Sequence, residues 1–594
     1  MWPWSRQTRL NKTSQQSDAQ KPGPHIKAGA ARLTHSLNDT QSVLRSISGV
    51  DTALLKQLIS QTSALNQELN ALTQELNPHT SLDQFTGDIE AVYQRLQSGV
   101  GQSPDIIIRR FLMGDKAKIP AVLTFVDGLT DTQMIDQDTI MLAQQYDHAF
   151  TRHHDPQTIH QVVHDLVTAS GHVTTETSWN KLMVKLMGGN TILFLSGSST
   201  ALVIDTVKYR ARSLTTPTTE RSVLGPQEAF NEVVLTQMNL LRMRIKSPNL
   251  RFDSLTIGEM SHTTVIVAHI EGLTNPELVA AVKRKLSVAK MATLNIGQEL
   301  TPLLASRYHS LFPQVRRTER PDVVARELTM GKVAILVDNT PFAMVVPNTL
   351  ADFYQTLEDY TMSFWGASLE RLVRFLGLIL GLLLPPLYIA LTSVNPELLP
   401  TKLVITIAGS RVGLPLPPVM EVLTMWAIIE ILREASLRLP KELSNTLGTV
   451  GAIVVGTAIV KAGIVSPLMI VIITLTALGL FTSPNYEMAT PWRVLFWFLI
   501  ALSYLFGLFG IILGLLAILA HLASLENFGV PYLSPFGPYR WRDLKDTFVR
   551  FPESSLTKRP AYLQPLDVTQ SSHWHVDPMP HPQLGQAQKE EQHG

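Results

Sequence analysis

FLGLILGLLLPPLYIALTSV, residues 375–394, has no charged side chain along its whole length. A helix needs about 20 apolar residues to cross the roughly 30 Å hydrocarbon core of a bilayer, so this stretch predicts a transmembrane helix. Pro385 and Pro386 are expected to kink it, because a proline removes a helical hydrogen bond. The composition changes abruptly near Leu372, which indicates an integral membrane protein with a large soluble region before its first span.

Two segments that follow are apolar but interrupted. Residues 403–431 contain charged side chains and the helix-breaking run GLPLPP, which predicts a re-entrant or discontinuous segment. Residues 446–482 are apolar except for Lys461 and are broken at Pro467, which favours two short helices.

The last apolar segment, residues 494–525, carries no formal charge. As a single helix it would extend about 48 Å, which is longer than the bilayer core, so a tilt or a break is expected. Its possible bending points are Gly507, Gly510 and Gly514. Together these segments predict an α-helical integral membrane domain of four to five spans over residues 363–530.

The region before the first span alternates between short apolar runs and helical stretches. Several runs are continuous enough to be strands buried on both faces of a sheet. The predicted strands lie within residues 105–113, 119–128, 191–197, 200–207, 263–272 and 332–347. Two hairpins are expected, with turns at residues 196–199 and 339–340.

Helical spacing of apolar residues occurs over residues 226–245 and 275–292. Strands and helices in this order predict an α/β or α+β region of two cytoplasmic subdomains. Their expected bounds are residues 101–220 and 221–362.

The ends of the chain have a different composition. Residues 1–50 are polar and are expected to be a disordered tail. Residues 51–100 are expected to form a helical or coiled-coil extension, because Leu58, Leu65 and Leu72 recur every seven positions. That spacing fits either one helix packed on a neighbour or self-association. Residues 531–594 are expected to be a C-terminal tail, largely disordered after residue 552.

Composition excludes several function classes. The chain of 594 residues has 50 basic and 49 acidic side chains and a net charge of +1, which gives no bulk attraction to nucleic acid. It has no cysteine, which excludes disulfides, thiolate catalysis and cysteine-ligated metals. No nucleotide-binding loop and no paired nucleophile and base occur, so neither an enzyme nor a cofactor is predicted.

Histidines and basic clusters add two expectations. His160 and His164 lie one helical turn apart but lack the glutamate of a zincin motif, so a solvated helix face is predicted rather than a metal site. The N-terminus has no apolar signal core and is expected to stay cytoplasmic. Basic clusters favour cytoplasmic placement of a loop at Arg433, Arg438 and Lys441 and of the tail at Arg540, Arg542, Lys545 and Arg550.

The stretch GTVGAIVVGTAIVKAGIVSP, residues 448–467, has two distinct faces. Small residues four apart are candidates for close helix packing: Gly448, Ala452 and Gly456. A mostly apolar strip that ends in a hydroxyl and an ammonium supplies pore-lining candidates: Val450, Val454, Thr457 and Lys461. Such a strip suits a narrow path closed by dewetting, although Lys461 could equally extend from a helix end to the interface.

Three further ionisable residues lie at possible membrane depth, where an unpaired charge costs several kcal/mol. They are Arg411, Glu421 and Glu430. Glu430 precedes Arg433 by three residues, which favours a local ion pair. Arg411 and Glu421 could pair across the proline break or contact water in a pore, and the sequence does not decide between these.

Several longer runs resemble the A subunit of the GerA family of spore germination receptors over roughly residues 105–552. They are VLGPQEAFNEVV with MNLLRMRIKSPNL, TERPDVVARELTMGKVAILVDNTPFAMVVP, EDY at 358–360, ERLVRFLG from 370 and REASLRLPKEL from 433. The chain departs from the family pattern at Thr457, where a glutamine is usual, and at Val223 and Leu224, where the family commonly has Arg-Gly.

The resemblance implies a receptor subunit in the inner spore membrane with a cytoplasmic N-terminal part. Its implied partners are identical copies, a transporter-like B subunit, a lipoprotein C subunit and membrane lipid. The implied activity is a ligand-gated channel that releases monovalent cations and starts germination. The alternatives are a scaffold subunit that does not conduct, and a paralogous branch of the family linked to dipicolinate release.

Overall fold

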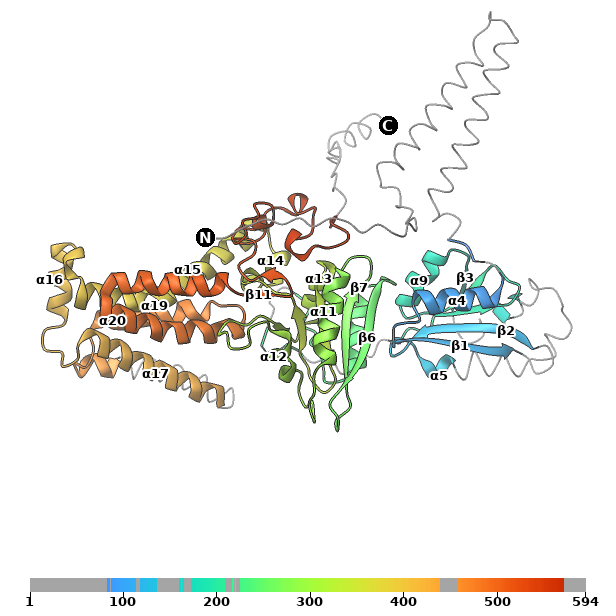
Figure 1. Ribbon diagram of the computed structural model, residues 1–594, viewed down its shortest axis with the longest axis horizontal. Helices are drawn as coiled ribbons and strands as arrows, with labels where there is room; N and C mark the ends of the chain where they lie inside the picture. Colours follow the sequence, from blue (N-terminus) through green and yellow to red (C-terminus); the bar gives the residue numbers. More distant parts are fainter. Residues whose placement is uncertain are drawn as a thin grey trace, which may run out of the picture.

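The computed structural model describes residues 83–85, 87–113, 118–135, 160–161, 163–164, 172–208, 216–217, 219–220, 225–438 and 457–570. The leucines spaced by seven, the N-terminal tail and the last residues of the C-terminal tail lie outside these ranges. Figure 1 shows an elongated molecule in which one sheet lies at one end, a bundle of helices lies at the other, and a second sheet lies between them.

The first sheet has the strand order β1-β2-β4-β5-β3, and all its pairings are antiparallel. Its elements are α4 Ile89–Gly99, β1 Ile106–Met113, β2 Ile119–Val126, α5 Thr132–Met134, β3 Val173–Glu176, α9 Trp179–Met187, β4 Thr191–Leu195 and β5 Ala201–Ile204. Every residue of β4 and β5 is buried, because apolar clusters cover both faces of the sheet.

The second sheet has the order β6-β7-β9-β10-β8, also antiparallel. Its elements are α10 Val234–Arg244, β6 Leu250–Ile257, β7 Thr263–Ile270, α11 Pro276–Ser287, α12 Thr301–Leu304, β8 Arg316–Thr318, α13 Pro321–Thr329, β9 Val333–Val337 and β10 Ala343–Val346. The strand order by sequence is the same in both sheets, and a helix, α9 or α13, precedes each second hairpin. The soluble region is therefore two copies of one topology.

A buried ion pair joins the two units. The Arg242 Nε on α10 lies 2.7 Å from the Asp105 Oδ2 at the start of β1, and both side chains are fully buried. The same guanidinium donates to the Ser103 hydroxyl at 3.2 Å. Because removing either partner would leave a charge without compensation in the interior, this pair ties the second unit to the first.

All six runs predicted as strands contain strands, and both predicted hairpins are confirmed. Three strands of the two five-stranded sheets were not predicted: β3, β6 and β8. The first and last of these have the short polar sequences VTTE and RRT. Their place in the sheets comes from pairing with β5 and β10, which no apolar pattern encodes.

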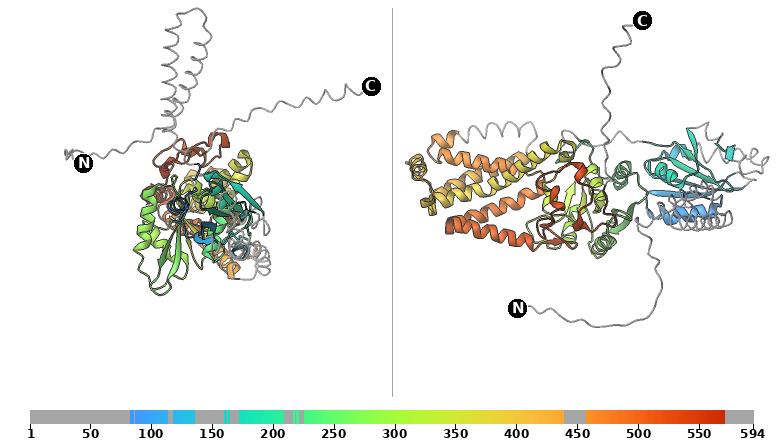
Figure 2. Two further views of the ribbon diagram at one scale, coloured as in Figure 1. Left: turned by 90° about the vertical axis from the view of Figure 1, so that its right-hand side faces the viewer. Right: turned by 90° about the horizontal axis from the view of Figure 1, so that it is seen from above.

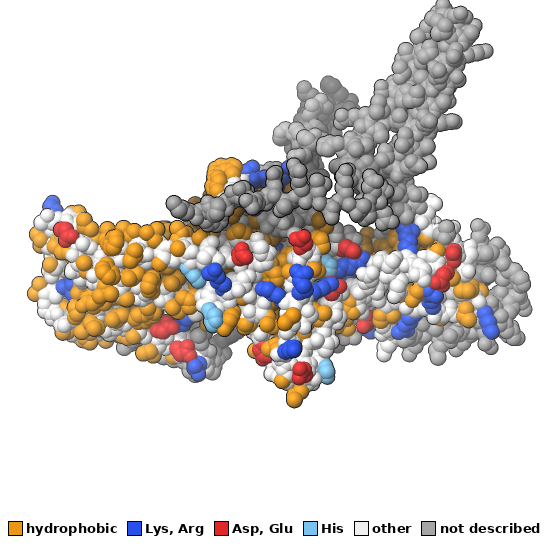
Figure 3. Space-filling view, in the orientation of Figure 1, with side chains coloured by type: hydrophobic (Ala, Val, Ile, Leu, Met, Phe, Trp, Pro, Cys, Tyr) orange, Lys and Arg blue, Asp and Glu red, His pale blue; other side chains and the backbone are white. Residues whose placement is uncertain are grey.

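The helical region contains two helices that are long and apolar enough to cross a membrane, Phe364–Val394 and Tyr486–Ala523. Its helices are α15 Phe364–Ile389 with a π turn at Ala390–Val394, α16 Thr401–Ser410, α17 Pro418–Arg438, α19 Pro467–Phe481 and α20 Tyr486–Ala523. Apolar side chains gather over the visible face of this bundle (Figure 3). A mixed α/β region followed by a helical region confirms the general class expected from the sequence.

A tilt or a break was expected in the last apolar segment, and the structure has a break at Gly507, whose φ of 60° and ψ of −138° interrupt α20. The chain reverses there. A Cβ added at Gly514 would meet the Leu499 side chain, although the two residues would lie about 22 Å apart in a straight helix. The two arms of α20 therefore run antiparallel, and Figure 2 shows helices of the bundle lying lengthwise beside one another.

The segment after α20 packs back onto the soluble region up to residue 570. It contains the short pair β11 Glu526–Asn527 and β12 Val530–Pro531, followed by single turns of 3-10 helix. The Leu566 N–H donates to the Leu273 carbonyl, and Arg559 donates to the Thr329 carbonyl. The sequence predicted a largely disordered tail after residue 552, whereas residues 553–570 cross the surface of the second unit.

Candidate functional site at the junction of the two regions

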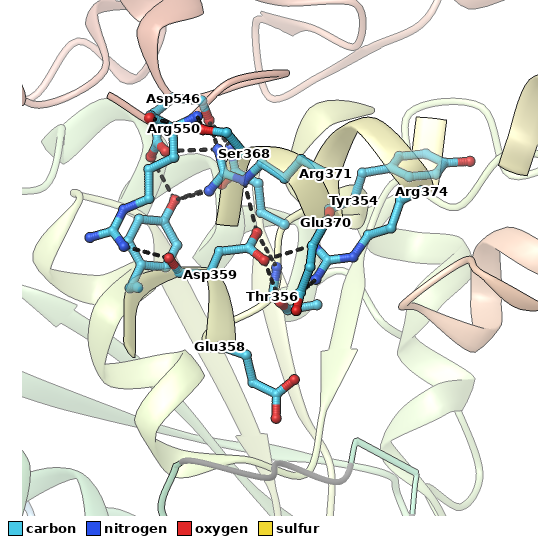
Figure 4. Close-up of polar contacts among 12 residues, drawn as sticks. Tyr354, Thr356, Glu358, Asp359, Ser368, Glu370, Arg371, Arg374, Asp546 and Arg550 are labelled. Atoms are coloured by element: carbon cyan, nitrogen blue, oxygen red, sulfur yellow. Dashed lines mark hydrogen bonds and ion pairs between the residues drawn. The ribbon is translucent and has the colours of Figure 1, made fainter. Parts of the chain in front are cut away.

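A buried carboxylate connects the soluble region to the first long helix. Asp359 lies on the short helix α14, Glu358–Thr361, and has no exposed surface. Its Oδ2 is 2.8 Å from the Arg371 Nε, and its Oδ1 is 2.8 Å from a terminal nitrogen of Arg374 (Figure 4). Both arginines face the same way because they are three residues apart on α15.

The segment after α20 closes the other side of this cluster. Arg371 donates to the Asp546 carboxylate at 2.9 Å, and the Tyr360 hydroxyl donates to the same carboxylate at 2.6 Å. The Arg550 N–H donates to the Ser368 hydroxyl at 3.0 Å. Residues from α14, α15 and the C-terminal segment thus share one network, which we call the junction network.

Tyr360 is the aromatic centre of the junction network. The guanidinium carbon of Arg326, from α13, lies 3.3 Å from its ring centroid, and those of Arg550 and Arg371 lie at 4.9 and 5.5 Å. Burial raises the pKa of Tyr360 above its usual range, so the hydroxyl stays protonated and donates. Burial opposes the charge of Asp359, but Arg371 and Arg374 hold its pKa below the usual range.

A second buried charge cluster lies beside this network. The Lys332 Nζ at the start of β9 is 2.7 Å from the Glu327 Oε2 and 2.8 Å from the Asp352 Oδ2, and its side chain is 1% exposed. Burial alone would raise the pKa of Glu327, but Lys332 and Arg316 lower it to about 2. The ionised carboxylates and the ammonium therefore fix α13 and β9 to the chain that leads into α14.

A cavity of about 530 Å³ lies between these clusters and the C-terminal segment. Its lining includes Arg326, Lys332, Asp352, Tyr360 and Asp546. These charged groups are engaged with one another, so the junction network and the Lys332 cluster together form this part of the cavity wall.

The last long helix is attached to the soluble region as well. Glu487, in the first turn of α20, pairs with Arg317 on β8. The Trp492 Nε1 donates to the Tyr354 hydroxyl at 2.6 Å, and the Tyr354 ring stacks on Phe375 of α15 at 5.2 Å. A displacement of the second sheet would therefore act on α15 and α20 together.

Most of the predicted pore and packing residues lie outside the described residues: Val450, Val454, Gly448, Ala452 and Gly456. Thr457 and Lys461 lie in the helical residues 457–461 and have exposed side chains. Neither belongs to the junction network, and their roles stay predictions.

The predicted intramembrane charges form ion pairs. Glu421 is fully buried, and its carboxylate lies 3.3 Å from Arg411 and accepts the Ser466 N–H at 3.1 Å. Glu430 pairs with Arg433 at 2.8 Å and with Arg493 of α20 at 3.0 Å. These pairs hold α17 against neighbouring segments at two positions along its length.

No group of three or more metal-ligating side chains occurs within the described ranges. Sequence reasoning did not single out Asp359, Arg371 or Asp546 as site residues. One signal was available: two arginines three apart immediately before an uncharged run are typical of a helix entering a bilayer from a charged anchor.

The fold and the junction network define the class of this protein. It has two parts, a duplicated α/β region and a bundle of apolar helices, and buried ion pairs hold the two parts together. The family described as Bacillus/Clostridium GerA spore germination protein matches residues 94–562. The chain belongs to the GerA family, as the sequence resemblance predicted.

The chain is also similar to individual proteins. The chain is 36% identical to spore germination protein KA of Bacillus subtilis, over 78% of this chain and 84% of that protein. It is 34% identical to the uncharacterized membrane protein YfkQ of Bacillus subtilis, over 77% and 87%. The crystal structure of the N-terminal domain of the A subunit of the Bacillus megaterium spore germinant receptor GerK3 matches 44% of this chain and 96% of that chain, at 26% identity and a TM-score of 0.35.

Proposed function

We propose that the chain is a membrane subunit of a nutrient-responsive spore germination receptor, and that identical copies assemble into a ligand-gated channel for monovalent cations. It acts without catalysis in the inner spore membrane, together with a transporter-like B subunit and a lipoprotein C subunit. Membership of the GerA family supports the receptor assignment. The soluble region, including the N-terminus, faces the cytoplasm.

The observation that carries this proposal is the junction network. Asp359 and Asp546 hold the start of α15 with ion pairs whose shared guanidinium, Arg371, is 1% exposed. Buried ion pairs have strict geometric requirements, so the helix follows the soluble region when that region moves. This is the connection that a receptor needs if an event in its soluble part or its partners is to open a path among its helices.

Contacts at the ends of the helical region constrain the number of crossings. Ser524 after α20 accepts a hydrogen bond from Arg307, and Glu487 at the start of α20 pairs with Arg317. Both ends of α20 therefore lie beside the soluble region, on the same side of the membrane as the start of α15. An even number of crossings follows, and we propose six in place of the four to five expected from the sequence, because the reversal at Gly507 adds one.

Cation flux into vesicles tests conduction. We expect purified protein reconstituted in liposomes to leak when Val454→Ser or Thr457→Ser widens and hydrates the apolar strip, while the parent stays closed. Val471→Ser is the matched control, since Val471 on α19 is 54% exposed. If cation flux is absent from both variants as well as from the control and the parent, the chain is a scaffold that links a sensor to a separate channel.

Cross-linking tests self-association independently of flux. The chain has no native cysteine, so a Gly448→Cys or Ala452→Cys variant supplies a unique thiol. We expect a disulfide-linked dimer in membranes from either variant, because small residues allow close helix approach. Met260→Cys, at the exposed tip of the β6–β7 hairpin, is the control that should stay monomeric.

A further inference from the structure

The C-terminal segment has two faces with different chemistry. Its inward face supplies Asp546 and Arg550 to the junction network. Its outward face carries large aromatic side chains: Tyr539 is 66% exposed and Trp541 70% exposed, with Phe548 and Phe551 partly exposed beside them. An aqueous surface rarely presents so many aromatic rings in one short segment.

Cations are interleaved with these rings. Arg540, Arg542 and Lys545 form no ion pair within the part of the chain that the structure describes. Among the acidic side chains of the segment, Asp546 binds Arg371, whereas Asp543 accepts the Ala561 N–H and attracts Arg540 and Arg542. One carboxylate therefore faces three cations, and the outward face keeps an excess of positive charge among aromatic rings.

The segment lies at the height where the apolar part of α15 begins. The Phe548 ring is 4.3 Å from the Phe375 ring, and Phe375 is the first residue of the uncharged run. Arg550 is bonded to Ser368, two turns earlier. Apolar exposure continues along α15 from Trp365, which is 75% exposed, to Leu376 and Ile379 in the uncharged run.

We propose that residues 539–551, which we call the collar segment, bind the headgroup layer of the membrane on the side of the soluble region and prefer anionic lipid. Aromatic side chains with one polar edge partition to this layer, and unpaired arginine and lysine are attracted to anionic headgroups. The inference rests on the proposed membrane placement of α15 and α20. It makes the collar segment a contact between lipid and the junction network.

A single fluorophore tests the collar segment in the full chain. A Tyr539→Cys variant, labelled with bimane, is reconstituted into vesicles of phosphatidylcholine with or without phosphatidylglycerol. A nitroxide carried on the lipid headgroup is expected to quench this label several-fold more than the same label at Met260→Cys, which is 79% exposed on the β6–β7 hairpin. Quenching should be stronger when phosphatidylglycerol is present.

Charge variants test whether the arginine side chains cause the preference for anionic lipid. In the Tyr539→Cys background, Arg540→Glu with Arg542→Glu should abolish the effect of phosphatidylglycerol, whereas Arg540→Lys with Arg542→Lys should keep it. If the glutamate pair leaves the phosphatidylglycerol effect unchanged, the preference for anionic lipid is wrong.

A label inside the bundle distinguishes failure of the collar from failure of membrane placement. Leu516→Cys on α20, 58% exposed, should be quenched by a nitroxide in the acyl chains. Quenching at Leu516→Cys without headgroup quenching at Tyr539→Cys overturns the collar alone. No quenching at either site overturns the membrane placement and the collar together. Emission at Tyr539→Cys that depends on protein concentration but not on nitroxide assigns the surface to a second copy of the chain and also overturns the proposal.

Discussion

At the scale of single residues, the junction network depends on a few buried charges that compensate one another. The carboxylate of Asp359 is fully buried between Arg371 and Arg374. Replacing it would leave two guanidiniums without their main partner in the interior. Such a loss costs about 3–5 kcal/mol, far more than loss of an exposed pair.

We therefore expect Asp359→Ala to lower the free energy of unfolding by about 3–5 kcal/mol. Thermal unfolding of the purified full chain in detergent, followed by tryptophan fluorescence, measures the change. Glu553→Ala is the control, because Glu553 pairs with Arg550 but is 75% exposed. Equal melting temperatures for the two variants would contradict the importance of the buried pair.

The Glu327 cluster predicts a dependence on pH. The pKa of Glu327 is lowered in the folded chain from 4.5 to about 2, which corresponds to about 3 kcal/mol of stability. A group with a lowered pKa contributes fully above its unfolded value and loses this contribution as the pH falls. We expect stability to decrease between pH 4.5 and pH 2 and the Glu327→Gln variant to show a shallower decrease.

Denaturant unfolding across this pH range measures the slope. Glu271→Gln is the matched control, since Glu271 pairs with Arg251 at the surface with 60% of its side chain exposed. Its slope should equal that of the parent chain. A Glu327→Gln slope equal to the parent's would show that other acidic groups dominate.

At the scale of elements, α20 shows how one glycine sets a topology. An uncharged run of this length suggests one long helix, but Gly507 adopts a positive φ that other residues rarely adopt. A Cβ at this position would also clash with the Asn395 Oδ1, just after the π turn that follows α15. The reversal thus needs both the backbone freedom of glycine and the absence of its side chain.

We expect Gly507→Ala to destabilise the chain by at least about 1–3 kcal/mol, because strain and a steric clash act together. Gly409→Ala on α16 is the control, since no atom lies within 4 Å of its added Cβ and alanine favours helix. Melting temperatures of both variants in detergent check this expectation. If the melting temperature of Gly507→Ala equals or exceeds that of Gly409→Ala, the reversal of the chain at Gly507 is wrong.

At the scale of the whole molecule, a repeated α/β unit and a helical bundle meet at one junction. The first unit touches the second through Arg242 and Asp105, and the second unit holds α15 and α20. A movement of the first sheet is therefore transmitted to the second unit, and the second unit transmits it to the helices. Both ends of the bundle's chain return to that unit, as the proposed even number of crossings requires.

Labelling with a membrane-impermeant maleimide tests this topology. Tyr486→Cys and Glu526→Cys flank α20 and should react from the same side of sealed vesicles as Met260→Cys in the soluble region. Val412→Cys, which follows α16 and is 82% exposed, should react from the opposite side. Reaction of Tyr486→Cys and Glu526→Cys from opposite sides would mean that α20 crosses once.

Much of the architecture was predictable because local patterns report burial. Continuous apolar runs such as 191–197 and 332–347 gave buried strands and hairpins, since a strand covered on both faces has no polar side to display. Long runs without charged residues predicted the helical region. The short strands β3 and β8 were missed because VTTE and RRT are held by their neighbours and not by burial of their own side chains.

The sequence by itself determined the family, the long buried strands with their two hairpins, and the candidate bending points in the last apolar segment. Tertiary structure alone decided which charges meet: Arg371 and Asp546 are 175 residues apart in the chain and 2.9 Å apart in space. It also decided that residues 553–570 pack on the second unit and that α20 doubles back. The physical reason is that an apolar pattern records how deeply a residue is buried, whereas the partner of a buried charge depends on how distant elements pack.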